Sequence, residues 1–139
     1  MAKFTKIIHQ KNENFLITKF IRLFRAKNRN KGKRRFSFVL TGGSSPIKLY
    51  KHLAKSRNIN WNKIDFFIGD ERYVKDTSKN SNIKMCKKYL LDKIKISDNQ
   101  IYKISTNKKS VKESVLDYEK KIKKYFFNKK VVFDLILLG

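Results

Sequence analysis

Two short polar segments follow apolar stretches of the chain, and the first suits the binding of an anion. Residues 41–45 contain Gly42 and Gly43, followed by Ser44 and Ser45. Glycines let backbone N–H groups approach an anion closely, the hydroxyls add donors, and a following helix would supply partial positive charge. The spacing matches neither the nucleotide P-loop nor the dinucleotide Gly-x-Gly-x-x-Gly motif. Spacing alone leaves two interpretations open, a phosphate cradle and a tight turn before a capped helix.

The second polar segment is Asp70-Glu71-Arg72, which follows the mostly apolar residues 64–68. A carboxylate can orient a hydroxyl or act as a base, and an arginine can hold a phosphate with two hydrogen bonds. A surface cluster of ion pairs is the alternative interpretation. If both apolar stretches are parallel strands, their carboxyl ends meet at one edge of the sheet. We therefore expect one pocket there for a phosphorylated polyol or sugar.

The elements that must position these segments alternate along the chain. Apolar periodicity predicts helices over residues 12–28, 46–54, 85–90 and 110–127, with Ser44 or Ser45 as the cap of the second. Strands are predicted at 36–40, 64–68, 101–104 and 131–139, the last buried on both faces. This alternation indicates an α/β layered fold with a mainly parallel sheet, in a single domain over residues 1–139.

The net charge of +24 raises the possibility of a basic nucleic-acid-binding module. The charge comes mostly from lysines spread along the chain, with asparagine and isoleucine also abundant, so we favour codon drift in an A/T-rich genome and expect no specific nucleic-acid partner. The one cysteine, Cys86, permits no intramolecular disulfide. There is no apolar run of membrane-spanning length, no signal peptide and no metal-ligand cluster, so we expect a cytoplasmic protein that needs neither membrane nor metal.

Three ordered motifs resemble the signatures of the 6-phosphogluconolactonases. The first is residues 38–46 with the apolar positions of the following helix, and the second is Trp61 with residues 64–74. Ser81-Asn82 falls where that family has such a pair, and residues 133–139 resemble the opening of the third signature. Ser45 stands where threonine is common in the family, which keeps the hydroxyl.

The resemblance implies a three-layer α/β/α fold like that of glucosamine-6-phosphate deaminase. It implies hydrolysis of 6-phosphogluconolactone to 6-phosphogluconate in the oxidative pentose phosphate pathway, with no cofactor. The phosphate would be held by the loop and the arginine, and Asp70 would be the catalytic candidate in a pocket shaped also by Asn82. The full set of substrate-binding candidates is Gly42, Gly43, Ser44, Ser45, Arg72 and Asn82.

In that family the third signature continues beyond the glycine that matches Gly139 into a loop with an aspartate and the histidine thought to activate water. Neither His9 nor His52 matches that position. We therefore expect a domain truncated at its carboxyl end, either a fragment, a split gene or an inactive remnant. A deaminase-like isomerase is the nearest enzymatic alternative, although Asp-Glu-Arg rather than Asp-Glu-Tyr favours the lactonase. The sequence does not determine the oligomeric state.

Overall fold

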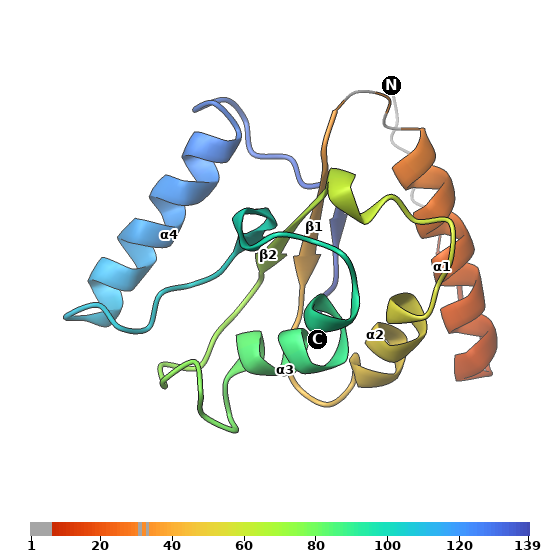
Figure 1. The fold of residues 1–139 in the computed structure, drawn as a ribbon, viewed down its shortest axis with the longest axis horizontal. Helices are drawn as coiled ribbons and strands as arrows, with labels where there is room; N and C mark the ends of the chain where they lie inside the picture. The colour runs from red at the N-terminus through yellow and green to blue at the C-terminus, as the bar shows by residue number, and fades with distance from the viewer. Residues whose placement is uncertain (1–6, 31, 33) are drawn as a thin grey trace.

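A four-stranded parallel sheet forms the centre of the computed structural model, which describes residues 7–30, 32 and 34–139 (Figure 1). The strands run in the spatial order β3-β2-β1-β4. Their bounds are β1 Phe36–Leu40, β2 Ile64–Ile68, β3 Ile101–Tyr102 and β4 Leu135–Ile136. The longer helices are α1 Glu13–Arg29, α2 Ile47–Ala54, α3 Asn82–Tyr89 and α4 Val111–Tyr125. The predicted alternation of helices and strands, and the parallel sheet, are confirmed.

The central pair of strands fixes the register of the sheet. β1 and β2 pair over their whole length, from Phe36 opposite Ile64 to Leu40 opposite Ile68. All ten of these residues are buried, as expected of a parallel sheet with helices on both faces. Three short 3₁₀ segments, Trp61–Lys63, Leu91–Lys93 and Asp98–Gln100, complete the connections between elements.

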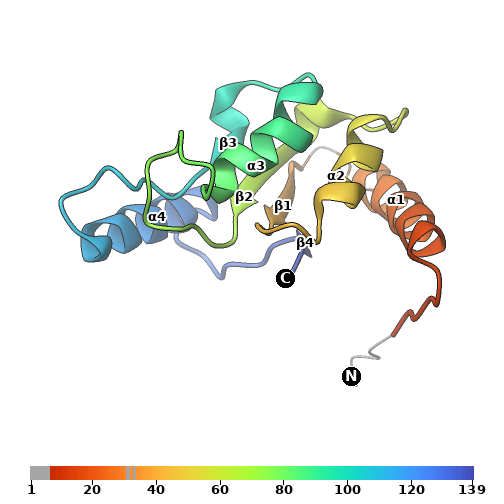
Figure 2. The ribbon, with the colours of Figure 1, turned by 90° about the horizontal axis from the view of Figure 1, so that it is seen from below.

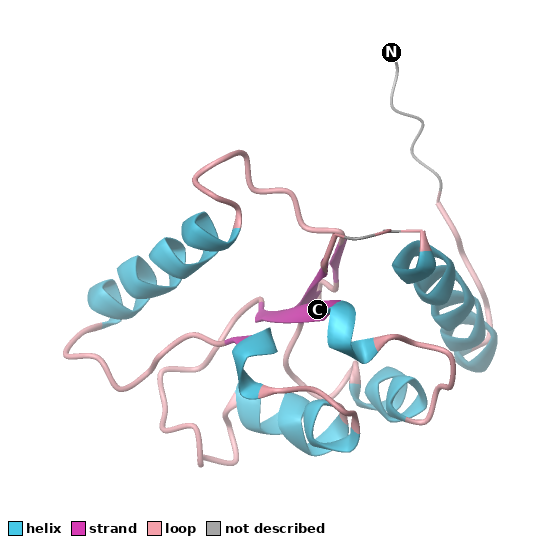
Figure 3. Ribbon diagram, turned by 45° about the horizontal axis from the view of Figure 1, so that its top comes forward, coloured by secondary structure: helices cyan, strands magenta, loops and turns pink. Residues whose placement is uncertain are grey.

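Three helices pack on one face of the sheet and one on the other. Phe24 of α1, Tyr50 of α2 and Cys86 of α3 belong to one core cluster with the alternate strand residues that begin at Phe36 and Ile64. On the opposite face, Phe67 contacts the ring of Tyr125 at the end of α4, with ring centroids 4.9 Å apart. Figures 2 and 3 show α4 set apart from the other three helices. The arrangement is the three-layer α/β/α fold that the resemblance implied.

The start of α2 differs from the prediction. Neither Ser44 nor Ser45 caps it, because Pro46 occupies the capping position and no side-chain capping bond forms. Pro46 has φ −81° and ψ −6°, a helical conformation, whereas a capping serine needs an extended backbone to fold its hydroxyl back onto the first turn. The N–H of Ile47 instead donates to the backbone oxygen of Ser44 at 3.2 Å.

The last strand is shorter and more exposed than predicted. β4 spans two residues, and in the described part of the chain it pairs only with β1. Ile136 is 49% exposed and Leu138 is 89% exposed, so the expectation of burial on both faces is wrong. A continuous apolar run indicates what a strand could bury, but the elements beside it decide how much it does bury.

Among the described residues, no helix has both the length and the apolar character that a membrane span requires.

Candidate active site

The ends of three strands meet at one edge of the sheet. The N–H of Gly69, just after β2, donates to the carbonyl oxygen of Leu40 at the end of β1 at 2.8 Å. A Cβ atom at position 139, just after β4, would lie 2.8 Å from the hydroxyl oxygen of Thr41. The two polar segments singled out in the sequence therefore begin side by side, as parallel pairing of their strands requires.

A buried tyrosine holds the first segment in place. The N–H of Thr41 donates to the hydroxyl oxygen of Tyr50 at 3.0 Å, and that hydroxyl donates to the carbonyl oxygen of Thr41 at 2.7 Å. Tyr50 lies on α2 with no exposed surface. Gly43 then takes a φ of +80°, a conformation that favours glycine, and Ser44 and Ser45 are exposed. The result is a loop anchored at its first residue and open to solvent at its serines.

The second segment is joined to the start of α3. The side-chain amide of Asn82 donates to the carboxylate of Asp70 at 3.1 Å and to its backbone oxygen at 3.0 Å. The carboxylate of Glu71 accepts from the backbone N–H groups of Asn82 at 2.6 Å and of Ile83 at 2.8 Å. These bonds fix the loop after β2 against the first turn of the helix.

A cavity of about 450 Å³ lies between these two segments. It is lined by four of the sequence-predicted residues, Gly43, Ser44, Arg72 and Asn82, and also by Lys79, Lys84 and Lys88. Its volume lies within the range of small-molecule sites. A set of four cationic side chains beside hydroxyl and amide donors suits a small anion.

The other predicted residues lie next to this cavity rather than on its wall. A Cβ atom at position 42 would overlap the side chain of Asn82, so Gly42 packs directly against that residue. Asp70 reaches the site through its hydrogen bonds to Asn82. Ser45 is exposed at the outer end of the loop.

Four features of the site were not found by sequence reasoning. The three lysines of the cavity lacked a distinctive signal because lysine is common throughout the chain. The contacts of Glu71 reach residues ten to twelve positions away, and the clamp by Tyr50 spans nine. The capping of α3 by Ser81, whose hydroxyl accepts from the N–H of Lys84, could have been found from its serine before a helical pattern.

Cys86 is unsuited to act as a nucleophile at this site. It is fully buried in the core, and burial raises the pKa of its thiol to about 12. The thiolate, which is the reactive form, is therefore scarce at neutral pH. The described residues contain no group of three or more metal-ligating side chains.

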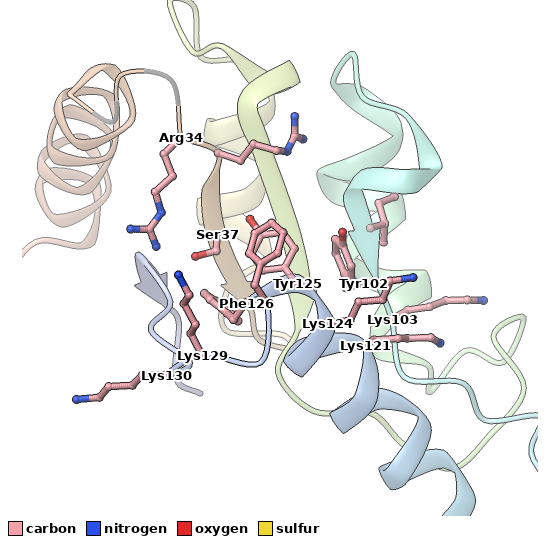
Figure 4. A pocket seen from close by; sticks show the side chains of 13 residues that line it. Arg34, Ser37, Tyr102, Lys103, Lys121, Lys124, Tyr125, Phe126, Lys129 and Lys130 are labelled. Atoms are coloured by element: carbon pink, nitrogen blue, oxygen red, sulfur yellow. The ribbon is translucent and has the colours of Figure 1, made fainter.

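A larger cavity of about 1010 Å³ lies on the other face of the sheet, between the start of β1 and the end of α4 (Figure 4). It holds none of the predicted site residues. Arg35 and Tyr125 line it, and both bond the buried carboxylate of Asp65 beneath it. Its remaining wall is mostly lysine and aromatic side chains. We take the smaller cavity as the candidate active site because Gly43, Ser44 and Arg72, which follow the ends of β1 and β2, line it.

Comparison with curated proteins finds relatives named 6-phosphogluconolactonase. The chain is 40% identical over 116 residues to a probable 6-phosphogluconolactonase of Schizosaccharomyces pombe, covering 75% of this chain and 44% of that protein. It is 34% identical over 108 residues to the 6-phosphogluconolactonase of a Nostoc species, covering 76% and 45%. The chain thus spans about half the length of the curated relatives it matches.

Solved structures agree with the sequence relatives. The 6-phosphogluconolactonase of Thermotoga maritima superposes with a TM-score of 0.77 at 28% identity, over 91% of this chain and 54% of that chain. The enzyme of Plasmodium vivax gives 0.75 at 32% identity, over 91% and 44%. A monomeric glucosamine-6-phosphate deaminase gives 0.78 at 15% identity, over 88% and 52%, which shows a shared fold alone.

A family model described as glucosamine-6-phosphate isomerases/6-phosphogluconolactonase matches residues 12–139, nearly the whole chain. The match includes both polar segments, the start of α3 and the last strand. The chain therefore belongs to the glucosamine-6-phosphate isomerase/6-phosphogluconolactonase family.

Proposed function

We propose that the candidate active site binds 6-phosphogluconolactone and that the protein acts in its hydrolysis to 6-phosphogluconate. One observation carries the proposal. Gly43, Ser44, Arg72 and Asn82 come from three separate segments, and all line one cavity of about 450 Å³. The relatives named 6-phosphogluconolactonase support the choice of substrate.

In this proposal the phosphate group lies between the loop after β1 and Arg72. The guanidinium of Arg72 offers two parallel hydrogen bonds, and the hydroxyl of Ser44 and the N–H of Gly43 add donors. Lys79, Lys84 and Lys88 contribute positive charge at the same wall. Gly42 leaves room for Asn82, and Ser45 extends the loop's donor set.

The sugar ring would lie toward Asp70 and Asn82. The amide of Asn82 orients the carboxylate of Asp70, which can then direct a sugar hydroxyl or accept a proton. In hydrolysis, water attacks the lactone carbonyl, the ring C–O bond breaks, and the ring oxygen leaves as a hydroxyl. Fixing the phosphate at one end places the carbonyl in a defined position, and such positioning lowers the barrier.

Binding of 6-phosphogluconate, the product, tests the site. Calorimetry on the 139-residue chain should show binding that gluconate, which lacks the phosphate, does not reproduce. Arg72→Ala should weaken binding by about 10-fold or more, because a charge-assisted hydrogen bond contributes about 1.5–3 kcal/mol. Arg57→Ala removes an exposed arginine outside the cavity and is the matched control. Equal binding of gluconate, or equal losses in both variants, would contradict the proposal.

Two further measurements separate the alternatives. Release of acid from 6-phosphogluconolactone, compared with turnover of glucosamine 6-phosphate, distinguishes lactonase from isomerase chemistry. A nucleic-acid-binding module would instead bind single-stranded RNA with a steep dependence on salt concentration. RNA should displace 6-phosphogluconate poorly if the site is selective for a sugar phosphate.

A further inference from the structure

Glu71 makes contacts at the candidate active site that none of the proposed substrate-binding roles uses. Its Oε1 accepts from the N–H of Arg72 at 2.8 Å and from the N–H of Asn82 at 2.6 Å. Its Oε2 accepts from the N–H of Ile83 at 2.8 Å and from the hydroxyl of Ser81 at 3.3 Å. One carboxylate therefore joins the loop after β2 to the first turn of α3.

We propose that Glu71 is a positioning residue for sugar-phosphate binding, which holds Arg72 and Asn82 in their places around the cavity. The inference rests on the proposed function of the site. Glu71 acts through its neighbours, and it is not among the residues that line the cavity.

The geometry of the shared oxygen supports this role. Arg72 is exposed, and the structure gives its backbone N–H a fixed partner in Glu71 Oε1. Asn82 is 5% exposed, and its backbone N–H bonds the same oxygen. Arg72, which is proposed to hold phosphate, and Asn82, which orients Asp70, thus both donate a backbone hydrogen bond to Glu71 Oε1. Without the carboxylate of Glu71, the loop and the helix keep the bonds of the Asn82 side chain to Asp70 but lose the bonds that fix the backbones of Arg72 and Asn82 to one another.

The charges at the two helix starts give a second argument. The first N–H groups of a helix attract anions. At α3 the carboxylate of Glu71 and the hydroxyl of Ser81 already bond the N–H groups of residues 82–84. At α2 no side chain caps the helix. An internal anion therefore occupies the α3 end, which leaves the loop beside α2 and Arg72 for the ligand's phosphate.

The same charge makes the proposal sharply testable. A carboxylate near an anion site repels the ligand, so a bystander glutamate should weaken binding, and its removal should strengthen it. A positioning role predicts the opposite result, namely that removal of the Glu71 carboxylate weakens ligand binding. Glu71→Ala should weaken 6-phosphogluconate binding about 10-fold, and Glu71→Gln, which keeps one acceptor oxygen, should weaken it less.

Ser110→Ala is the matched control for lost helix capping. The hydroxyl of Ser110 accepts from the N–H of Glu113 at the start of α4, outside the candidate active site. The Ser110→Ala substitution should lower the stability of the chain by an amount typical of a lost helix cap and leave the affinity for 6-phosphogluconate unchanged. Affinities are measured by calorimetry at low temperature, where circular dichroism confirms that each variant is folded.

Backbone amide resonances separate failure of this inference from failure of the proposed function. If the wild-type chain binds 6-phosphogluconate and both Glu71 variants bind it as tightly or more tightly, the positioning role is overturned while the proposed function stands. If the wild-type chain does not bind, the proposed function fails. The positioning role then rests on whether Glu71→Ala moves the amide resonances of Gly42 and Gly43, which lie in the other loop, and unmoved resonances overturn it.

Discussion

Gly42 and Asn82 are in such close contact that no side chain fits between them. A Cβ atom at position 42 would lie 2.0 Å from Cγ of Asn82 and 2.1 Å from its Oδ1. The loop after β1 and the start of α3 are forty residues apart in the sequence and are fitted together at this point. The contact explains why the first glycine of the loop, Gly42, cannot be replaced by a larger residue. The second, Gly43, has open space around it and is required instead by its positive φ.

Gly42→Ala should therefore displace Asn82, weaken 6-phosphogluconate binding about 10-fold or more and destabilise the chain, because a buried neighbour must move to admit a methyl group. Urea unfolding and calorimetry measure the two effects. Asn82→Ala makes room for that methyl group, so the double variant should be less destabilised than the sum of the single variants. If the destabilisations by the two single substitutions simply add in the double variant, the contact between Gly42 and Asn82 does not determine the position of the loop.

Tyr50→Phe should destabilise the chain by about 1–3 kcal/mol, because it leaves the N–H and C=O of Thr41 without the hydroxyl that they share. The urea midpoint measures this loss. Tyr73→Phe is the control, since the hydroxyl of Tyr73 bonds a single backbone oxygen at an exposed position and should matter little. Equal effects of the two substitutions would contradict the clamp.

The strands that carry the site could be predicted from sequence because each has local signals. Residues 36–40 and 64–68 are mostly apolar, β-prone and bounded by turn or charged residues, and the structure has strands with those bounds. The last strand was predicted too long because its burial depends on its neighbours, which a local pattern does not encode. The serine caps of α2 were wrong because Pro46 took the capping position.

The site is a harder case than the fold. Proximity of the two polar segments followed from parallel pairing, and the cavity brings Ser44 and Arg72 together as expected. The bonds of Glu71 and Tyr50 could not be foreseen, since they depend on the tertiary placement of α2 and α3. Assignment of substrate roles to these residues stays a prediction.

Arg35→Ala should destabilise the chain by about 2 kcal/mol, because it leaves the carboxylate of Asp65 buried without its charged partner. Arg35 Nε and Nη2 each lie 2.5 Å from an oxygen of Asp65, whose side chain is 3% exposed. Because the side chain of Arg35 is about half exposed, the loss of stability should be smaller than that for a fully buried ion pair. Asp65→Asn in the Arg35→Ala background should recover part of the loss, as urea midpoints would show. Affinity for 6-phosphogluconate should not change, because the pair lies at the other end of the strands.

Alkaline pH should unfold the chain through buried Tyr50 and Cys86 and the half-buried Tyr118 and Tyr125. Burial raises the pKa of Cys86 from 9.0 to about 12, and burial likewise raises the pKa values of Tyr50, Tyr118 and Tyr125 above 10.0. Between the unfolded and folded pKa values the folded chain binds more protons than the unfolded chain, so rising pH favours unfolding. The contribution of these groups is complete below about pH 9 and is lost as pH rises toward 12. Urea midpoints measured at intervals across that range should fall steadily, and Tyr118→Phe should make the fall less steep. A midpoint that stays constant to the upper end of the range would mean that these side chains titrate as they do in water.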